Sequence, residues 1–213
     1  MNQRHTSSAS RPKPIFFKYR SLENWRFVVD LFVNQRLFAA PYRDLNDPME
    51  GRYSYFKDEI SREFRRQVRG RKGELRICSL SEDPKNTLMW SYYAGGHKGI
   101  AVGVVPKHRR QDSPRQEPVI YEKEITLKSE DVDQGANAVA IHVLSRKLDA
   151  WAHEKEIRIF TRGEFVRVDI RKVLFGCLME KQDKELVRAL VRRTNPGVRI
   201  EEVRRSDLDM PLR

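Results

Sequence analysis

The sequence contains little cysteine and no long hydrophobic run. Its 213 residues include two cysteines, Cys78 and Cys177, which lie far apart and form no Cys-x-x-Cys pair. This excludes a disulfide framework and a zinc cluster, and two reduced thiols are typical of a cytoplasmic protein. No apolar run approaches the ~20 residues of a membrane span, and residues 1–14 lack the apolar core of a secretory signal. We therefore expect a cytoplasmic protein that does not engage a membrane.

Short motifs that mark common enzyme classes are absent as well. The chain has no P-loop, no Rossmann glycine triplet and no Gly-x-Ser-x-Gly, which argues against a kinase, a dehydrogenase and a serine hydrolase. Asp47 and Glu50 are close in sequence, but no His, Cys or Asp partners surround them at the spacing of a metal site. We expect no metal, and we interpret Asn46-Asp47-Pro48 as a rigid turn in which Asn46 forms an Asx-turn.

Positive charge is in excess and is unevenly distributed. Lysine and arginine number 42 against 30 acidic residues, which gives a net charge of +12. Residues 1–76 hold 17 basic and 9 acidic residues, whereas residues 77–150 hold 10 of each. The densest group runs from Arg62 to Lys72, and four of its members recur at helical spacing: Arg62, Arg65, Arg66 and Arg69. Such a face attracts phosphate backbones, and it equally suits a nucleotide, an acidic partner or plain solubility.

Hydrophobic periodicity predicts a single α+β domain of short, mostly antiparallel strands with flanking helices. We expect this domain to span residues 15–205, between a disordered basic arm (1–14) and a tail (206–213). Both faces of the strand 99–105 are apolar, which is typical of a central, buried strand. The other main expectations are helices over 21–35, 84–94, 136–151 and 183–194, a loop over 108–118, and a hairpin formed by 156–161 and 164–170.

Several uncommon motifs follow one another in an order that resembles a known family. They are Tyr19 in the first strand, Asn46-Asp47-Pro48-x-Glu50-Gly51, Cys78-x-Ser, Leu88-Met89-Trp90-Ser-x-Tyr93, His97-x-Gly99 and Trp151-x-x-Glu154-x-Glu156-x-Arg158. From about residue 17 to residue 203 the chain is similar to the prokaryotic and phage family called domain of unknown function 2971. The resemblance implies one folded unit of this size and a set of signature residues, but no particular reaction.

A further resemblance concerns the polar signature residues. Arg20 and Ser79 at two strand ends, followed by Glu154-x-Glu156, are similar to the arginine–serine–glutamate layout of ADP-ribosyltransferases. Cleavage of the nicotinamide–ribose bond of NAD passes through an oxocarbenium-like cation, which a carboxylate stabilises. The resemblance implies that Glu156 and Glu154 are catalytic and that Arg20 and Ser79 bind NAD. Further predicted NAD contacts are Ser81 and the aromatic residues Tyr19, Trp90, Tyr92 and Tyr93.

Two interpretations of these residues stay open. Glu154-x-Glu156-x-Arg158 on one strand face also fits a salt-bridge network that braces the sheet without chemistry. His97, in a glycine-rich loop, is either an assisting acid–base residue or a cap of the preceding helix, and Trp90 is more typical of a core. The first hypothesis is an NAD-using, ADP-ribosyltransferase-like effector, such as a toxin or a phage-defence protein. The alternative is a non-enzymatic module that binds nucleic acid through the face Arg62–Lys72.

Overall fold

A large, mostly antiparallel sheet forms the centre of the computed structural model, which describes residues 13–107 and 115–208. Its strands follow one another in the order β13 (Arg199–Glu202), β12 (Phe165–Phe175), β6 (Ile100–Pro106), β1 (Phe16–Arg20), β5 (Arg76–Ser81), β11 (Glu156–Thr161) and β7 (Arg115–Pro118). β2 (Arg36–Phe38) adds to β12, and β3 (Ala40–Pro41) adds to β5. Only β12 and β13 pair in parallel along this series of described strands. The predicted α+β class is confirmed.

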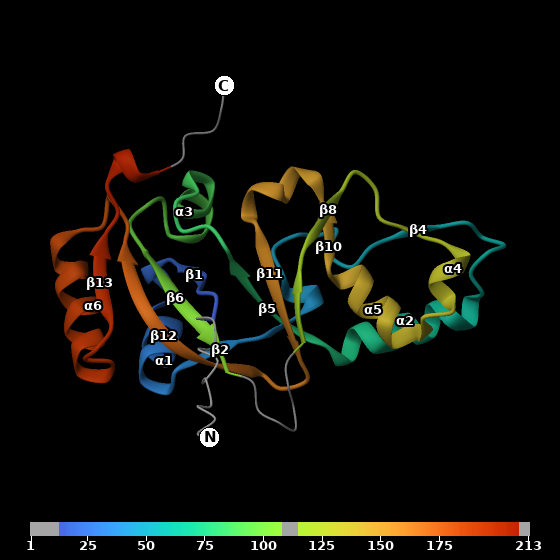
Figure 1. Cartoon of the computed structure of the whole chain (residues 1–213), viewed down its shortest axis with the longest axis horizontal. Coiled ribbons are helices and arrows are strands. Elements are labelled where there is room, and N and C mark those ends of the chain that lie inside the picture. The colour runs from blue at the N-terminus through green and yellow to red at the C-terminus, as the bar shows by residue number, and fades with distance from the viewer. Residues whose placement is uncertain (1–12, 108–114, 209–213) are drawn as a thin grey trace, which may run out of the picture.

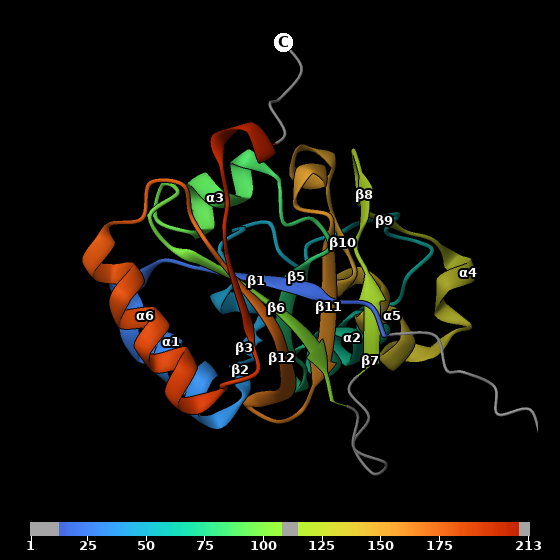
Figure 2. The same cartoon turned by 60° about the vertical axis from the view of Figure 1, so that its left-hand side comes forward.

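Helices gather at both ends of the sheet (Figures 1 and 2). α1 (Trp25–Asn34) and α6 (Lys181–Thr194) lie side by side near β12 and β13, whereas α2 (Arg62–Glu74) and α5 (Gly135–Leu144) pack together beyond β11. α3 (Thr87–Tyr93) contacts β1. The remaining described elements are short: α4 (Ser129–Val132), η1 (Leu22–Asn24), η2 (Tyr42–Asp44), η3 (Asp149–Glu154), η4 (Arg205–Asp207), and the parallel pairs β8 (Ile120–Glu122) with β10 (Arg146–Leu148) and β4 (Ser54–Tyr55) with β9 (Thr126–Leu127).

Amphipathic helices supply the cores at the two ends. α1 and α6 turn their apolar stripes toward the sheet, where Phe32 and Val187 have no exposed surface. α2 is strongly basic, and it is held in place because Val68 is fully buried against Val139 and Leu144 of α5. Burial of each such side chain contributes about 1.5–3 kcal/mol. A third cluster joins α3 to β1.

The predicted central strand is confirmed. All seven residues of β6 are buried between β12 and β1, as the apolar character of both its faces requires. β6 also fixes the position of its neighbour. Gly99, just before β6, lies so close to β1 that an added Cβ would stand 2.1 Å from the carbonyl oxygen of Arg20. Only glycine permits this approach, so the end of β1 is placed by β6.

β1 separates from its other neighbour, β5. It pairs with β6 along its whole length, but with β5 only where Phe17 faces Ser81. Beyond that position the two strands line opposite sides of a cavity. The side chains of Lys18 and Arg20 share one face of β1 and reach this opening.

Several sequence predictions about the elements are wrong or shifted. Residues 115–118, which were expected in a loop, form the strand β7. β11 and β12 are both strands, but they do not form a hairpin, because β11 pairs with β5 and β7 whereas β12 pairs with β6. The helix expected over 136–151 ends at Leu144, and the helix expected from residue 84 begins at Thr87. Residues 1–12 of the predicted arm, 108–114 of the predicted loop and 209–213 of the predicted tail lie outside the described residues.

Candidate functional site

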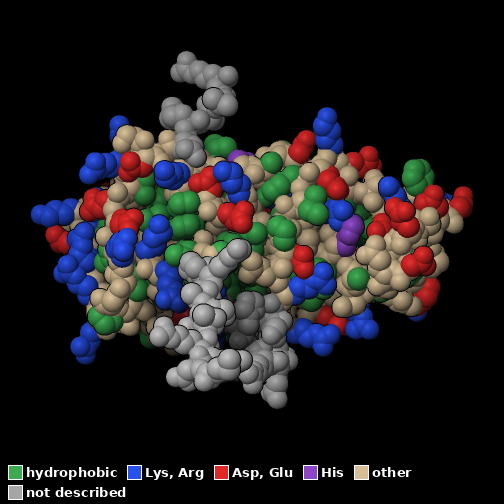
Figure 3. Space-filling model, viewed as in Figure 1, with side chains coloured by type: hydrophobic (Ala, Val, Ile, Leu, Met, Phe, Trp, Pro, Cys, Tyr) green, Lys and Arg blue, Asp and Glu red, His purple; other side chains and the backbone are tan. Residues whose placement is uncertain are grey.

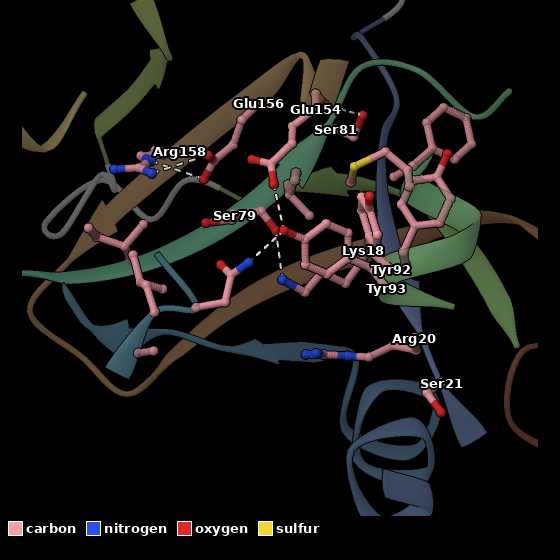
Figure 4. A pocket seen from close by; sticks show the side chains of 18 of the residues that line it. Lys18, Arg20, Ser21, Ser79, Ser81, Tyr92, Tyr93, Glu154, Glu156 and Arg158 are labelled. Atoms are coloured by element: carbon pink, nitrogen blue, oxygen red, sulfur yellow. Dashed lines mark hydrogen bonds and ion pairs between the residues drawn. The ribbon is translucent and has the colours of Figure 1, made fainter. Parts of the chain in front are cut away.

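A cavity of about 370 Å³ opens beside β1, β5 and β11 (Figure 4). Its size lies at the lower end of the range of ~300–1,000 Å³ that is usual for ligand pockets. Five of the residues predicted to act on NAD line it together: Arg20, Ser79, Ser81, Glu154 and Glu156. Tyr92 and Tyr93 at the end of α3 also line it. Residues separated by more than a hundred positions in sequence therefore converge on one concave surface.

The two carboxylates reach the cavity by different routes. Glu156 begins β11, whereas Glu154 is the last residue of η3, so the expected alternation along one strand is not what aligns them. Between them Lys155 adopts a left-handed conformation, with φ of 43°. Its Nζ lies 2.8 Å from Oδ2 of Asp83, which ties this strained residue to the end of β5. The turn at Lys155 brings both carboxylates to the same wall.

Arg158 forms the centre of the buried network on that wall. Its guanidinium donates to both oxygens of Glu50, at 2.5 and 2.8 Å, and to both oxygens of Glu156, at 2.9 and 3.1 Å. It also donates to the carbonyl oxygen of Leu144 at 2.5 Å. The side chain is 1% exposed, and such a bidentate pair on each side fixes it rigidly. Arg158 thus braces β11 as the structural interpretation expected, with Glu50 as a partner from outside the strand.

Glu156 is held in the ionised state. Burial alone would raise the pKa of its carboxyl group, but the charges of Arg158 and Lys147 outweigh burial and lower the pKa to about 2. A hydrogen bond with the side chain of Ser79 acts in the same direction. Lys147 Nζ is 3.6 Å from Oε2 of Glu156. Glu156 is therefore a fixed negative charge at the cavity wall and does not exchange protons near neutral pH.

Glu154 is oriented by a second set of hydrogen bonds. Lys147 Nζ donates to its Oε2 at 2.6 Å, and the Tyr93 hydroxyl donates to its Oε1 at 2.5 Å. The amide of Asn46 donates in turn to the Tyr93 oxygen at 2.6 Å. Burial and the nearby Glu154 raise the pKa of the Tyr93 hydroxyl, so it stays a donor. Asp47, and not Asn46, forms the Asx-turn of this loop, through the backbone N–H of Met49.

The two serines have separate tasks. Ser79 lies opposite Arg158 across β5 and β11 and supports Glu156. Ser81 is buried, donates to the carbonyl oxygen of Glu154 at 2.7 Å and accepts from the backbone N–H of Asp83 at 3.1 Å. Its hydroxyl group is thus used to hold the segment that presents Glu154.

The opposite side of the cavity is positive. Lys18 and Arg20 reach it from β1, facing Glu154 and Glu156 (Figure 4). The Nε of Arg20 is inaccessible to solvent and has no hydrogen-bond partner among the described residues, and its guanidinium lies 5.6 Å from the centre of the Phe27 ring. Burial lowers the pKa of Arg20. A buried N–H donor without a partner is costly, and such groups in native proteins call for an explanation such as a ligand.

Two other predicted site residues, Trp90 and His97, lie outside the cavity wall, whereas Tyr19 is part of it. Trp90 has no exposed surface, donates to the carbonyl oxygen of Pro84 at 2.9 Å and is absent from the cavity wall, so it is a core residue. Tyr19 lines the cavity, but its ring packs edge-on against Trp90, at 5.2 Å between centroids, and its hydroxyl donates to the carbonyl oxygen of Asp83. His97 occupies a turn with φ of 68° and lies 3.9 Å from the sulfur of Cys177, outside the cavity wall.

The predicted basic face is only partly a free surface. Arg62, Arg66 and Arg69 are exposed on α2, but Arg66 pairs with Glu63 at 2.8 Å. Arg65 packs on the ring of Tyr55, at 4.3 Å. Lys72 does not belong to the face, because it is buried and donates to the carbonyl oxygen of Gly51 at 2.5 Å. On the side of the molecule seen in Figure 3, basic and acidic side chains are interspersed.

Neither a group of metal ligands nor a membrane-spanning helix is found among the described residues. Among residues 13–107 and 115–208, no three His, Cys, Asp or Glu side chains gather as metal ligands would. In the same ranges, no helix has both the length and the apolar character needed to cross a bilayer.

Sequence reasoning missed three members of the site. Lys18 lies two positions before Arg20 on β1, so both side chains are on the same face of the strand. This alternation could have identified Lys18 from the sequence. Lys147 gave no local signal, and Glu50 was recognised only as part of a sequence motif, because their contacts with Glu154 and Arg158 are created by the fold.

Fold and site together define an α+β protein in which a carboxylate–cation network forms one wall of an open cavity. Residues 89–159 match the model of the family described as "Protein of unknown function (DUF2971)". This match confirms the family resemblance over the segment from α3 to β11, which carries Tyr93, Lys147, Glu154, Glu156 and Arg158. No curated protein and no solved structure gives a significant match. The likeness to ADP-ribosyltransferases stays a prediction.

Proposed function

We propose that the cavity binds NAD and that the protein cleaves the nicotinamide–ribose bond, passing ADP-ribose to a nucleophile or to water. The observation that carries this proposal is the convergence of two oriented carboxylates, Glu154 and Glu156, on one cavity with Arg20, whose Nε has no hydrogen-bond partner among the described residues. A structural role alone gives the buried Nε of Arg20 no such partner, and a buried donor without a partner lowers stability.

The separation of charge in the cavity supports this choice of substrate. The wall at β11 holds three carboxylates, those of Glu50, Glu154 and Glu156, against two cations, Lys147 and Arg158. The wall at β1 holds two cations without a carboxylate partner among the described residues. NAD has the complementary arrangement, since its diphosphate is anionic and its nicotinamide–ribose end is cationic. Attraction at both ends favours one orientation, with the ribose toward Glu156.

The proposed chemistry needs a fixed negative charge and no general acid. When the bond breaks, its electron pair leaves with nicotinamide, which becomes neutral, and positive charge develops on the ribose. The ionised carboxylate of Glu156 stabilises that charge more strongly in the transition state than before it. The attacking nucleophile then forms a bond to the same ribose carbon and loses its proton to solvent. Glu154, held by Tyr93 and Lys147, orients that nucleophile.

Aromatic side chains at the opening support binding of a planar ring. The side chain of Tyr92 is 64% exposed at the cavity, and Phe27 is 41% exposed beside Arg20. Stacking on such a ring contributes about 1–3 kcal/mol for a nucleobase. These rings take over the role that the sequence interpretation gave to Trp90. An effector acting on cellular NAD as a toxin or in phage defence fits this chemistry and stays a prediction.

The test is NAD consumption by the purified full chain. We expect release of nicotinamide by the wild type and its loss in Glu156→Gln, which retains the shape of the side chain and an oxygen that accepts from Arg158. Glu202→Gln is the matched control, because Glu202 is an exposed glutamate that pairs with Lys184 at 2.8 Å far from the cavity. Release that is equal in all three proteins, or absent in the wild type with water and with protein and nucleic-acid acceptors, would refute the proposal.

A further inference from the structure

Lys18 is a cavity residue whose charge the fold leaves unpaired. Its Nζ donates to the backbone carbonyl oxygen of Ser79 at 2.7 Å and makes no ion pair with a carboxylate among the described residues. A carbonyl oxygen satisfies one of the three donors of an ammonium group but none of its charge. The nearest charged group on its own strand is Arg20, which repels it.

The positions of Lys18 and Arg20 suit two linked anionic groups. Side chains two positions apart on a strand start roughly 6.6 Å from each other. Both are long, and both reach the same cavity. Lysine presents a compact point charge, whereas arginine presents a planar fork of N–H donors. Two linked phosphates place one anionic group at each cation, whereas the charges of a single phosphate lie on one small group that cannot meet both cations equally well.

We propose that Lys18 is a specificity-determining residue that, together with Arg20, selects ligands with a diphosphate over ligands with a single phosphate. On binding, Lys18 Nζ gives one N–H to a phosphate oxygen while Arg20 binds the other phosphate. The inference rests on the proposed function for its biological substrate, but the recognition of diphosphate does not depend on NAD cleavage.

The environment of Lys18 adds a dependence on pH. Burial, and next the charge of Arg20, lower the pKa of Lys18 to about 8, while Cys78, Glu156 and Glu154 oppose the shift. The ammonium form is therefore lost within the accessible pH range. Diphosphate affinity is expected to fall as the pH rises through 8, provided that the charged form of Lys18 is the one that binds.

Calorimetric titration of the full chain with inorganic pyrophosphate and with inorganic phosphate tests the inference. Wild type is expected to bind pyrophosphate more tightly than phosphate, and Lys18→Met to weaken pyrophosphate binding by about tenfold to a hundredfold. Lys18→Arg keeps the charge and is expected to retain most of the affinity. Lys107→Met is the matched control, because Lys107 pairs with Asp169 at 2.7 Å on the surface and is not part of the cavity.

The outcomes separate this inference from the proposed function. Equal pyrophosphate affinity in wild type and Lys18→Met, equal affinity of the wild type for phosphate and pyrophosphate, or no pyrophosphate binding would overturn the inference even if NAD is cleaved. Lys18-dependent pyrophosphate binding without NAD cleavage would support the inference and refute the proposed function. A loss of affinity in Lys107→Met as large as in Lys18→Met would also count against it.

Discussion

Replacing the two cavity arginines by methionine should change stability in opposite directions. Arg158 and Arg20 both line the cavity, but Arg158 is paired with two glutamates and Arg20 has none. The same chemical change therefore compares a side chain that holds the fold with one that we propose binds a ligand. Proteins commonly retain destabilising groups at functional sites, and removing them raises stability at the cost of function.

The expected magnitudes follow from the contacts. The buried Arg20 Nε without a partner costs about 1–3 kcal/mol, and the contact with the Phe27 ring returns about 0.5–1 kcal/mol. Arg20→Met is thus expected to raise the free energy of unfolding by about 1 kcal/mol, which is about 2–4 °C in Tm for a chain of this size. Arg158→Met leaves Glu50 and Glu156 buried and unpaired, so it is expected to cost about 3–5 kcal/mol and to lower Tm by on the order of 10 °C.

Thermal and urea unfolding of the two variants, beside the wild type, measure both effects. The assay needs no ligand and no knowledge of the reaction. If Arg20→Met lowers Tm as much as Arg158→Met does, Arg20 is a structural residue and the reasoning behind the cavity is refuted. If Arg158→Met is as stable as the wild type, the network is not the brace described above.

Two further predictions concern the basic residues of α2. Burial, with smaller effects of Arg69 and Arg43 and an opposing effect of Glu50, lowers the pKa of Lys72 to about 8 in the folded protein. Between pH 8 and about 10, Lys72 is therefore mostly deprotonated in the folded chain but still protonated in the unfolded chain. The free energy of unfolding should then rise with pH by at most about 1.4 kcal/mol per pH unit. Urea unfolding should show this rise relative to Lys72→Met, and parallel pH profiles would contradict it. Nucleic-acid binding through α2 stays a prediction. The affinity for nucleic acid should fall steeply as the salt concentration rises, and it should be lost when Arg62, Arg66 and Arg69 are replaced by Glu. Binding that does not depend on salt, or that is unchanged in this variant, would exclude a nucleic-acid interface on α2.

The types of the helices and strands could be predicted from the sequence more accurately than the pairing of the strands. The run 99–105 identified β6 as a buried central strand, because a strand that is apolar on both faces has few other stable positions. The pairing of β11 could not be predicted, because two alternating strands joined by a glycine look like a hairpin whether or not the chain crosses the sheet between them. Local pattern determines the type of element, and long-range packing determines its partner.

In the site, too, local sequence pattern and long-range packing determine different features. Residue types and strand ends sufficed to bring Arg20, Ser79, Glu154 and Glu156 to one cavity. The role of each residue was less accessible. Glu154 and Glu156 are aligned by the left-handed turn at Lys155, a conformation that sequence patterns rarely reveal for a lysine.

The most direct test of the account is a crystal structure of the protein with ADP-ribose bound. We predict the diphosphate at Lys18 and Arg20, with a phosphate oxygen within hydrogen-bond distance of the Arg20 guanidinium, and the ribose next to the nicotinamide position beside Glu156. ADP-ribose bound along α2, bound in the cavity with its diphosphate turned away from β1, or not bound at a saturating concentration would contradict it.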